Sequence, residues 1–128
     1  MSLRSPVGRV LGLGSAKEGA AHWWSQRVSA VALVLLGLWF AAALLCLDDF
    51  SHATVLAWLG APLNAVLASL LIGTAAYHSQ LGVQVVVEDY IANKGWKIVT
   101  MLLVNFLHVA LGALGVFSVL RIAFGAAA

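Results

Sequence analysis

The segment Tyr77–Ile91, YHSQLGVQVVVEDYI, holds most of the residues in this chain that could do chemistry. His78 stands in an apolar stretch, Gly82 follows it by four residues, and the stretch ends on Asp89 and Tyr90. A neutral imidazole can bind iron through one ring nitrogen. A carboxylate beside a phenol can move protons and donate a hydrogen bond to a carbonyl group. The segment therefore combines a candidate metal or cofactor ligand with a candidate site for proton-linked binding.

The spacing of these residues places them on one side of a helix. With about 3.6 residues per turn, Thr74, Gly82, Val85 and Asp89 fall on the same face as His78. A residue without a side chain, one turn from a histidine, leaves a flat gap in which a haem could lie. The same pair also fits an ordinary interface, in which His78 bonds to another helix and Gly82 allows close packing. Spacing alone leaves both interpretations open.

A second histidine, His108, belongs to a stripe of polar and small residues. Asn105, Gly112 and Gly115 accompany it at spacings of three and four. In lipid, such stripes mark close approach of helices and hydrogen bonds between them. We therefore interpret His108 as a packing residue; the alternative is that His78 and His108 ligate one iron within the same chain.

The composition indicates a membrane protein that must position these residues on transmembrane helices. The chain has 128 residues, 62% hydrophobic and 9% charged, and a mean hydropathy of +0.99. Three stretches carry no formal charge, residues 28–47, 63–87 and 98–120, and each is long enough to cross a hydrocarbon layer of about 30 Å. Short connections make neighbouring helices antiparallel. We predict an all-α integral membrane protein whose three transmembrane helices form an up-down-up bundle.

The expected domain organisation follows from these stretches. We place the helices at about residues 25–47, 62–88 and 97–122 of a transmembrane domain, residues 25–123, after a cytoplasmic or interfacial tail, residues 1–24. Pro62 suits the first turn of a helix, where its missing N–H costs nothing. His22 and His52 are expected outside the helices.

The basic residues predict the orientation in the membrane. Asp48 and Asp49 follow the first helix in a connection that lacks basic residues. Basic residues precede the first helix and follow the second: Arg4, Arg9, Lys17, Arg27, Lys94 and Lys97. Because Lys and Arg near helix ends stay on the cytoplasmic side, we expect a cytoplasmic N-terminus. They form no dense patch interleaved with aromatic residues, so nucleic acid is not an expected partner.

Two segments of the chain resemble a known family. HSQLGVQVVVEDY resembles the second-helix signature of the hydrophobic membrane-anchor subunit, the D subunit, of succinate dehydrogenase (respiratory complex II), with a His, a Gly four residues on, and Asp-Tyr at eleven and twelve. GSAKEGAAHWWSQRVSAVAL is similar to the segment that leads into the first helix of that family. Length, helix number and expected orientation agree, so the resemblance spans most of the chain.

The resemblance implies a role for each matching residue. His78 would be an axial ligand of the iron of a b-type haem, shared with the partner anchor subunit, the C subunit. Tyr90 would donate a hydrogen bond to a carbonyl of ubiquinone, the substrate, and Asp89 would belong to its proton supply. Arg27 would lie near the haem propionates or the quinone site.

The resemblance also implies a place in metabolism. Electrons from succinate would pass through a flavoprotein subunit and an iron–sulfur subunit to ubiquinone at the inner (cytoplasmic) membrane, linking the tricarboxylic acid cycle to the respiratory chain. The chain would be a multi-pass subunit in contact with membrane lipid and these partners. It has one cysteine, Cys46, and no dinucleotide fingerprint, so it cannot itself bind the iron–sulfur clusters or the flavin. We expect no activity from the chain alone.

Two other classes of function fit the sequence. A haemless structural anchor would make the spacing of His78 and Tyr90 incidental. A small transporter or channel would use His78, Gln80 and Gln84 as a polar relay. The glutamines are expected to point away from the His78 face, however, and no inverted repeat or broken helix accompanies them.

Overall fold

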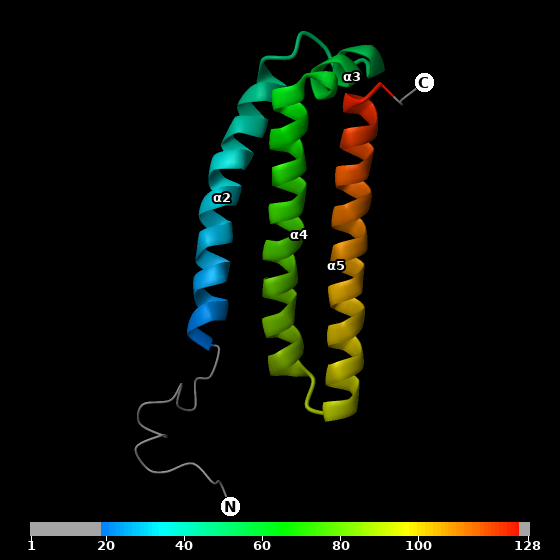
Figure 1. Cartoon of the computed structure of the whole chain (residues 1–128). Coiled ribbons are helices and arrows are strands. Elements are labelled where there is room, and N and C mark those ends of the chain that lie inside the picture. The colour runs from blue at the N-terminus through cyan, green and yellow to red at the C-terminus, as the bar shows by residue number, and fades with distance from the viewer. Residues whose placement is uncertain (1–18, 126–128) are drawn as a thin grey trace, which may run out of the picture.

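The computed structural model describes residues 19–125, and over that range the chain is helical with short connections. In chain order the helices are α2 (Gly19–Leu45), α3 (His52–Gly60), α4 (Pro62–Tyr90) and α5 (Lys94–Ala123). Three of them, α2, α4 and α5, are long and apolar enough to cross a membrane, and they run side by side in alternating directions (Figure 1). The prediction of an all-α chain with three antiparallel membrane helices is confirmed. Residues 1–18 of the expected tail lie outside the described range.

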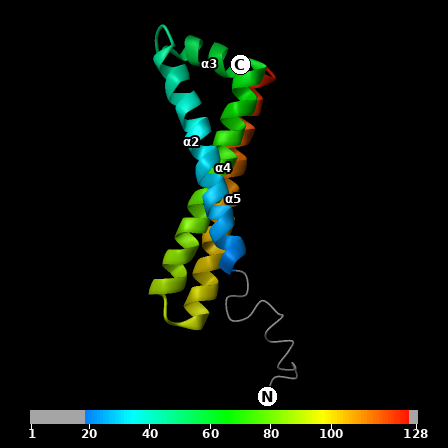
Figure 2. The same cartoon turned by 90° about the vertical axis from the view of Figure 1, so that its left-hand side faces the viewer.

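The three long helices form a single layer with α4 in the middle. Helix α4 contacts both α2 and α5, whereas α2 and α5 do not contact each other along the described residues. Figure 2, turned by a quarter, shows α2 crossing α4 at an angle. Few described side chains are therefore buried: Ser29, Ala65, Ala68, Leu81, Val87 and Val119. Both faces of α4 are left for lipid or for other membrane helices to cover.

Glycines on α5 allow the closest contact in this layer. A Cβ atom at Gly112 would lie 3.2 Å from the Cβ atom of Ala76, and one at Gly115 would lie 2.8 Å from Cγ2 of Ile72. About two turns before Gly112 on the same stripe, Asn105 accepts a hydrogen bond from Gln80 of α4. The interpretation of the α5 stripe as a packing surface is confirmed.

Helix α3 lies in the connection between α2 and α4, where the sequence analysis expected no helix. Ser51 caps it, since its hydroxyl accepts a hydrogen bond from the Thr54 amide at 3.3 Å. Trp58 then stacks on Trp39 of α2, with ring centroids 5.8 Å apart. Hydrogen bonds from Thr54 and Ser51 also lower the pKa of the Asp49 carboxyl just before the helix. A serine cap before an apolar run was the available signal for this helix.

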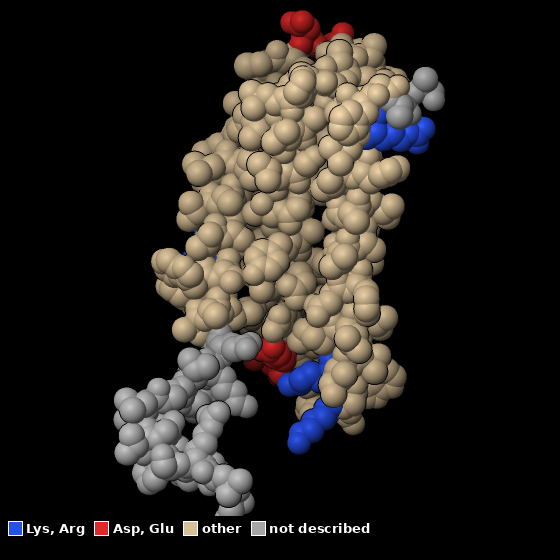
Figure 3. Space-filling model, viewed as in Figure 1, with Lys and Arg blue, Asp and Glu red and all other residues tan. Residues whose placement is uncertain are grey.

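Two helices, α2 and α5, begin earlier than expected. Helix α2 already begins at Gly19, and α5 begins at Lys94 because the Asn93 side chain accepts hydrogen bonds from the Gly95 and Trp96 amides at 2.9 and 3.1 Å. Helix α4 starts at Pro62, as predicted. Charged atoms on the face in Figure 3 gather mainly toward the two ends of the layer. The uncharged band between them matches the hydrocarbon layer that the helices would cross.

We predict that Gly115→Val weakens the packing of α5 on α4. The added side chain would collide with Ile72, whose branched side chain has little rotamer freedom in a helix, and overpacking typically costs about 1–3 kcal/mol. The measurement is the free energy of unfolding in detergent, followed by circular dichroism. The control is Gly37→Val, because a Cβ at Gly37 meets nothing within 4 Å. Equal stability of the two variants would contradict the packing role.

Candidate functional site

Both ring nitrogens of His78 face α2. Its Nδ1 atom lies 2.9 Å from the hydroxyl oxygen of Ser29, and its Nε2 atom lies 3.3 Å from the amide nitrogen of Gln26. Ser29 is only 6% exposed. Because Gln26 and Ser29 are three residues apart, they stand on the same face of α2 and reach the imidazole together. The central histidine is thus held between two membrane helices.

With the Gln26 side chain placed so that its amide nitrogen faces Nε2, the hydrogen bonds fit one tautomer of a neutral His78. The Gln26 amide nitrogen can only donate, so Nε2 must be the accepting nitrogen and Nδ1 must carry the proton. Nδ1–H then donates to the Ser29 hydroxyl oxygen. The Ser29 hydroxyl in turn donates to the backbone carbonyl oxygen of Gln26 at 3.1 Å. In this arrangement the lone pair of Nε2 points at the Gln26 side chain.

Gly82 borders the same side chain of Gln26. A Cβ atom built on Gly82 would meet only Gln26 Nε2, at 3.8 Å. The other amide atom, Gln26 Oε1, is buried and has no hydrogen-bond partner in the described structure, and such a group typically costs about 1–3 kcal/mol. The side chain that occupies the space beside Gly82 is therefore weakly held. Gln26 is thus the side chain that contacts both Nε2 of His78 and the space beside Gly82.

These contacts fit the donor set of a haem ligand. A ligating histidine usually donates its second N–H to a fixed acceptor, which Ser29 provides, and binds the iron through the nitrogen that carries no proton. No group of three or more His, Cys, Asp or Glu residues that could hold a metal ion occurs within residues 19–125. Among the described residues, His78 therefore does not belong to a cluster of three or more such side chains.

His108 lies on the other side of α4. Its Nδ1 atom donates to the Val104 carbonyl oxygen at 2.8 Å, and its ring lines a cavity of about 440 Å³ between α4 and α5. His78 faces α2 instead, so the structure does not bring the two histidines together. The alternative in which both ligate one iron in a single chain finds no support in this geometry.

The glutamines of α4 also point away from His78. The Gln80 amide nitrogen donates to Asn105 Oδ1 at 2.8 Å and to Gln84 Oε1 at 3.3 Å, and Gln84 donates to Glu88 Oε1 at 2.8 Å. Amide groups do not titrate near neutral pH, so a ladder of amides is a poor proton relay. The bond from Gln80 to Asn105 joins α4 to α5. The expected direction of the glutamines is confirmed.

Asp89 and Tyr90 end α4 at the surface, about 18 Å along the helix from His78. Tyr90 is 84% exposed, and Asp89 is also exposed. Arg27 places its guanidinium over the Trp23 ring, 5.5 Å from the centroid. Within the described residues it forms no ion pair with Asp89. The chain thus presents these three side chains separately and does not build a closed pocket from them.

A second groove, of about 660 Å³, lies between α2 and α4. It shares Gly73 and Tyr77 with the cavity next to His108. Ser69, which also lines it, has a buried hydroxyl oxygen with no hydrogen-bond partner among the described residues. Tyr77 is therefore flanked by hollows on both sides, along a face of α4 that neither neighbouring helix covers.

Sequence reasoning missed the partners of His78. Gln26 and Ser29 were visible as polar residues on an apolar helix, but their depth relative to His78 depends on how α2 crosses α4.

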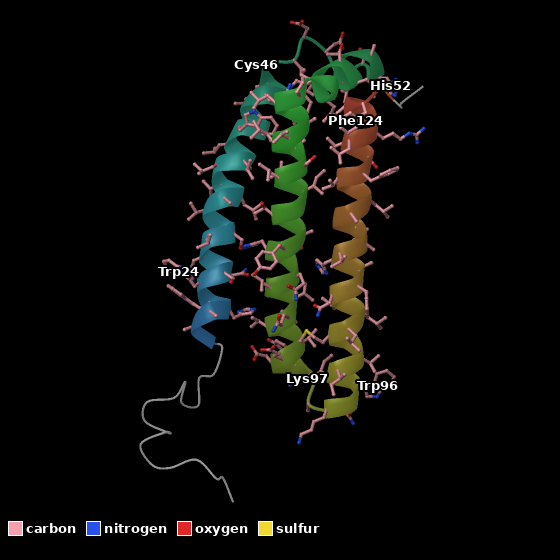
Figure 4. All side chains as sticks on the ribbon, viewed as in Figure 1. Trp24, Cys46, His52, Trp96, Lys97 and Phe124 are labelled. Carbon is pink, nitrogen blue, oxygen red and sulfur yellow. The ribbon has the colours of Figure 1, made fainter. Side chains whose placement is uncertain are left out.

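The expectation for the outer histidines was wrong, because His22 lies in α2 and His52 begins α3. His22 Nε2 is buried without a partner in the described structure. Figure 4 shows Trp24, Trp96 and Lys97 toward the same end of the layer.

Comparison with known proteins gives one consistent family. The family described as "Succinate dehydrogenase/Fumarate reductase transmembrane subunit" matches residues 1–112. The succinate dehydrogenase hydrophobic membrane anchor subunit of Rickettsia bellii (strain RML369-C) is 38% identical over 90 residues, covering 70% of this chain and 71% of the relative. The subunit of the same name from Paracoccus denitrificans is 31% identical over 115 residues, 90% of this chain and 88% of the relative. No solved structure matches significantly.

Proposed function

The chain belongs to the family of succinate dehydrogenase/fumarate reductase transmembrane subunits, and from this premise we propose that it anchors a succinate dehydrogenase in the membrane and supplies one axial ligand of a b-type haem. The observation that carries the haem assignment is the pair of contacts that the two ring nitrogens of His78 make with Ser29 and Gln26. Its Nδ1–H donates to Ser29 at 2.9 Å, which leaves the Nε2 lone pair as the ligating position. Gly82 supplies the flat space beside it. A bound haem supplies a one-electron carrier within the membrane.

The second axial ligand belongs to a partner anchor subunit, the C subunit. His108 is turned to the opposite side of α4, toward α5, and its Nδ1 atom is held by the Val104 carbonyl oxygen. The single-layer fold supports such a partner, because one face of α4 carries the two grooves that share Gly73 and Tyr77. Polar groups without partners are costly in hydrocarbon. Helices of a second anchor subunit that pack on this face of α4 would cover the two grooves.

The end of α4 contributes to the ubiquinone-reduction site. Tyr90 is exposed and free to donate its phenolic hydrogen to a quinone carbonyl, while Asp89 beside it can pass protons from water. Arg27 lies one turn from Trp23 and within reach of an anionic group, such as a haem propionate or the quinone site, if the partner closes around it. The pocket is completed by the iron–sulfur subunit and the partner anchor, since the chain alone leaves it open.

The chain is a multi-pass membrane protein of the inner (cytoplasmic) membrane in this proposal. Its N-terminus is cytoplasmic, because the basic residues of the N-terminal segment and of the α4–α5 connection stay on that side. Tyr90 then lies at the cytoplasmic surface, where the iron–sulfur and flavoprotein subunits deliver electrons from succinate. The chain carries no chemistry of its own on succinate.

We predict that His78→Ala removes the b-type haem signal from the purified complex. The change deletes a ligand while leaving a small helix-forming residue in place. The measurement is a reduced-minus-oxidised difference spectrum, normalised to the amount of flavoprotein subunit. His108→Ala is the matched control and is expected to keep its haem. Haem that survives in His78→Ala and vanishes in His108→Ala would reverse the assignment.

We predict that Tyr90→Phe lowers ubiquinone reduction at least about tenfold while electron transfer from succinate to a soluble dye is unchanged. Loss of the phenolic hydroxyl removes a hydrogen bond to the quinone, which is worth about 1.5 kcal/mol or more when the acceptor gains charge. Both activities are measured on the same preparation. Tyr77→Phe, at the other tyrosine of the chain, is the control. Equal loss of dye and quinone reduction in Tyr90→Phe would instead indicate misassembly.

We predict that Gly73→Leu prevents the partner anchor from packing on α4. A Cβ at Gly73 meets nothing within 4 Å, so the chain itself tolerates the larger side chain, but it fills the floor of both grooves. The measurement is co-purification of the partner anchor with this subunit. Gly37→Leu, which also enters open space, is expected to assemble normally. Normal assembly of Gly73→Leu would mean that the partner packs elsewhere.

A further inference from the structure

We propose that Ser29 and Gln26 are positioning residues that act oppositely on His78: Ser29 fixes the imidazole for haem binding, and Gln26 competes with the haem for its Nε2 atom. This inference rests on the proposed function of His78 as an axial ligand. It goes beyond that function because it assigns two residues of α2 to the control of haem loading. Neither residue touches the iron in this proposal.

Ser29 is suited to fix the ring because it is itself fixed. The Ser29 side chain is 6% exposed, and its hydroxyl donates to the backbone carbonyl oxygen of Gln26 at 3.1 Å. With its own proton committed, the oxygen can only accept at its second position, 2.9 Å from His78 Nδ1. This bond keeps the proton on Nδ1 and sets the plane of the ring. It also makes the imidazole a stronger electron donor, which favours the oxidised iron.

Gln26 competes for the ligating nitrogen because Nε2 has one lone pair. That lone pair now accepts the Gln26 amide proton across 3.3 Å, and it cannot bind iron at the same time. The Gln26 bond is long, and the carbonyl oxygen of the same amide is buried without a partner. Because of both features, a ligand can displace the Gln26 side chain from Nε2. Haem loading then exchanges the Gln26 amide for the iron, and the amide leaves the space beside Gly82.

The opposite signs of the two effects separate this proposal from a simple packing role of α2. If Ser29 and Gln26 only held α2 against α4, removal of either side chain would loosen the haem. The proposal instead requires that loss of the Ser29 hydroxyl weakens haem retention and that loss of the Gln26 amide speeds haem loading.

The experiment compares Ser29→Thr with Ser29→Val in the complete complex. The two side chains have nearly the same shape, but only Thr keeps the hydroxyl. We expect haem transfer from Ser29→Val to excess apomyoglobin to be about 10- to 100-fold faster than from Ser29→Thr, with the midpoint potential of its haem shifted upward. Ser79→Ala is a control, because the Ser79 hydroxyl donates only to the Ala76 carbonyl on the exposed side of α4. Its haem is expected to behave as in the wild type.

The Gln26 arm measures haem loading. The haem is removed from the purified complex, haemin is added back, and the rate of reconstitution is followed at the Soret band. Gln26→Ala is expected to load several-fold faster than the wild type, and slower loading would overturn the competition. If Ser29→Val cannot be purified as a complex, Ser29→Ala provides the same comparison with less steric change.

The outcomes also distinguish this inference from the proposed function. If the wild-type complex holds no haem, or keeps it in His78→Ala, the haem assignment itself fails. If the haem depends on His78 but Ser29→Val matches Ser29→Thr in transfer rate and potential, only the role of Ser29 is overturned.

Discussion

The constraint on which this structure depends is that hydrocarbon offers no hydrogen-bonding partner to a polar side chain. His78 stands about midway along α4 and would be costly there alone. Its two ring nitrogens are met by Ser29 and Gln26 across the α2–α4 interface. The crossing of α2 over α4 is therefore fixed by this polar contact as much as by apolar packing, which buries few side chains.

The same constraint operates on the other flank of α4, with a different result. There the amide ladder from Glu88 to Asn105 joins α4 to α5, and the glycines of α5 let the two backbones approach. The Gln80–Asn105 bond of the ladder crosses between the helices, and the other two bonds lie within α4. On the α2 side, by contrast, the buried Gln26 Oε1 and the nearby His22 Nε2 have no partner in the described range. Polar side chains are paired on the α5 side of α4, whereas two polar atoms on the α2 side are left for a ligand to engage.

The single-layer arrangement explains why a subunit of this kind works within an assembly. A central helix with two neighbours that do not touch each other keeps two faces open. In water such a layer would not be stable, but in lipid its apolar faces need no further cover. The open faces are compatible with the proposal that α4 holds a ligand near α2 and meets other subunits at its Tyr90 end. Functions that lie about 18 Å apart along one helix can thus be shared among several chains.

The sequence by itself determined the number of membrane helices, the start of α4 at Pro62 and the packing role of the α5 stripe. These follow from local rules, namely hydropathy over about 20 residues, the fixed backbone of proline and the spacing of small residues. The signal for helix α3, a serine cap before a short apolar run, was present but was not used, and the early start of α2 was also missed.

Only the tertiary structure decided that Ser29 and Gln26 meet His78 and that His108 does not. Sequence spacing orders residues around one helix, but which residues of two helices face each other depends on their rotation, depth and crossing angle. A shift of α2 by one turn would leave His78 beside different side chains. The candidate chemical residues therefore lie in one segment of the sequence, whereas the two side chains that contact the His78 ring come from a helix about fifty residues earlier in the chain.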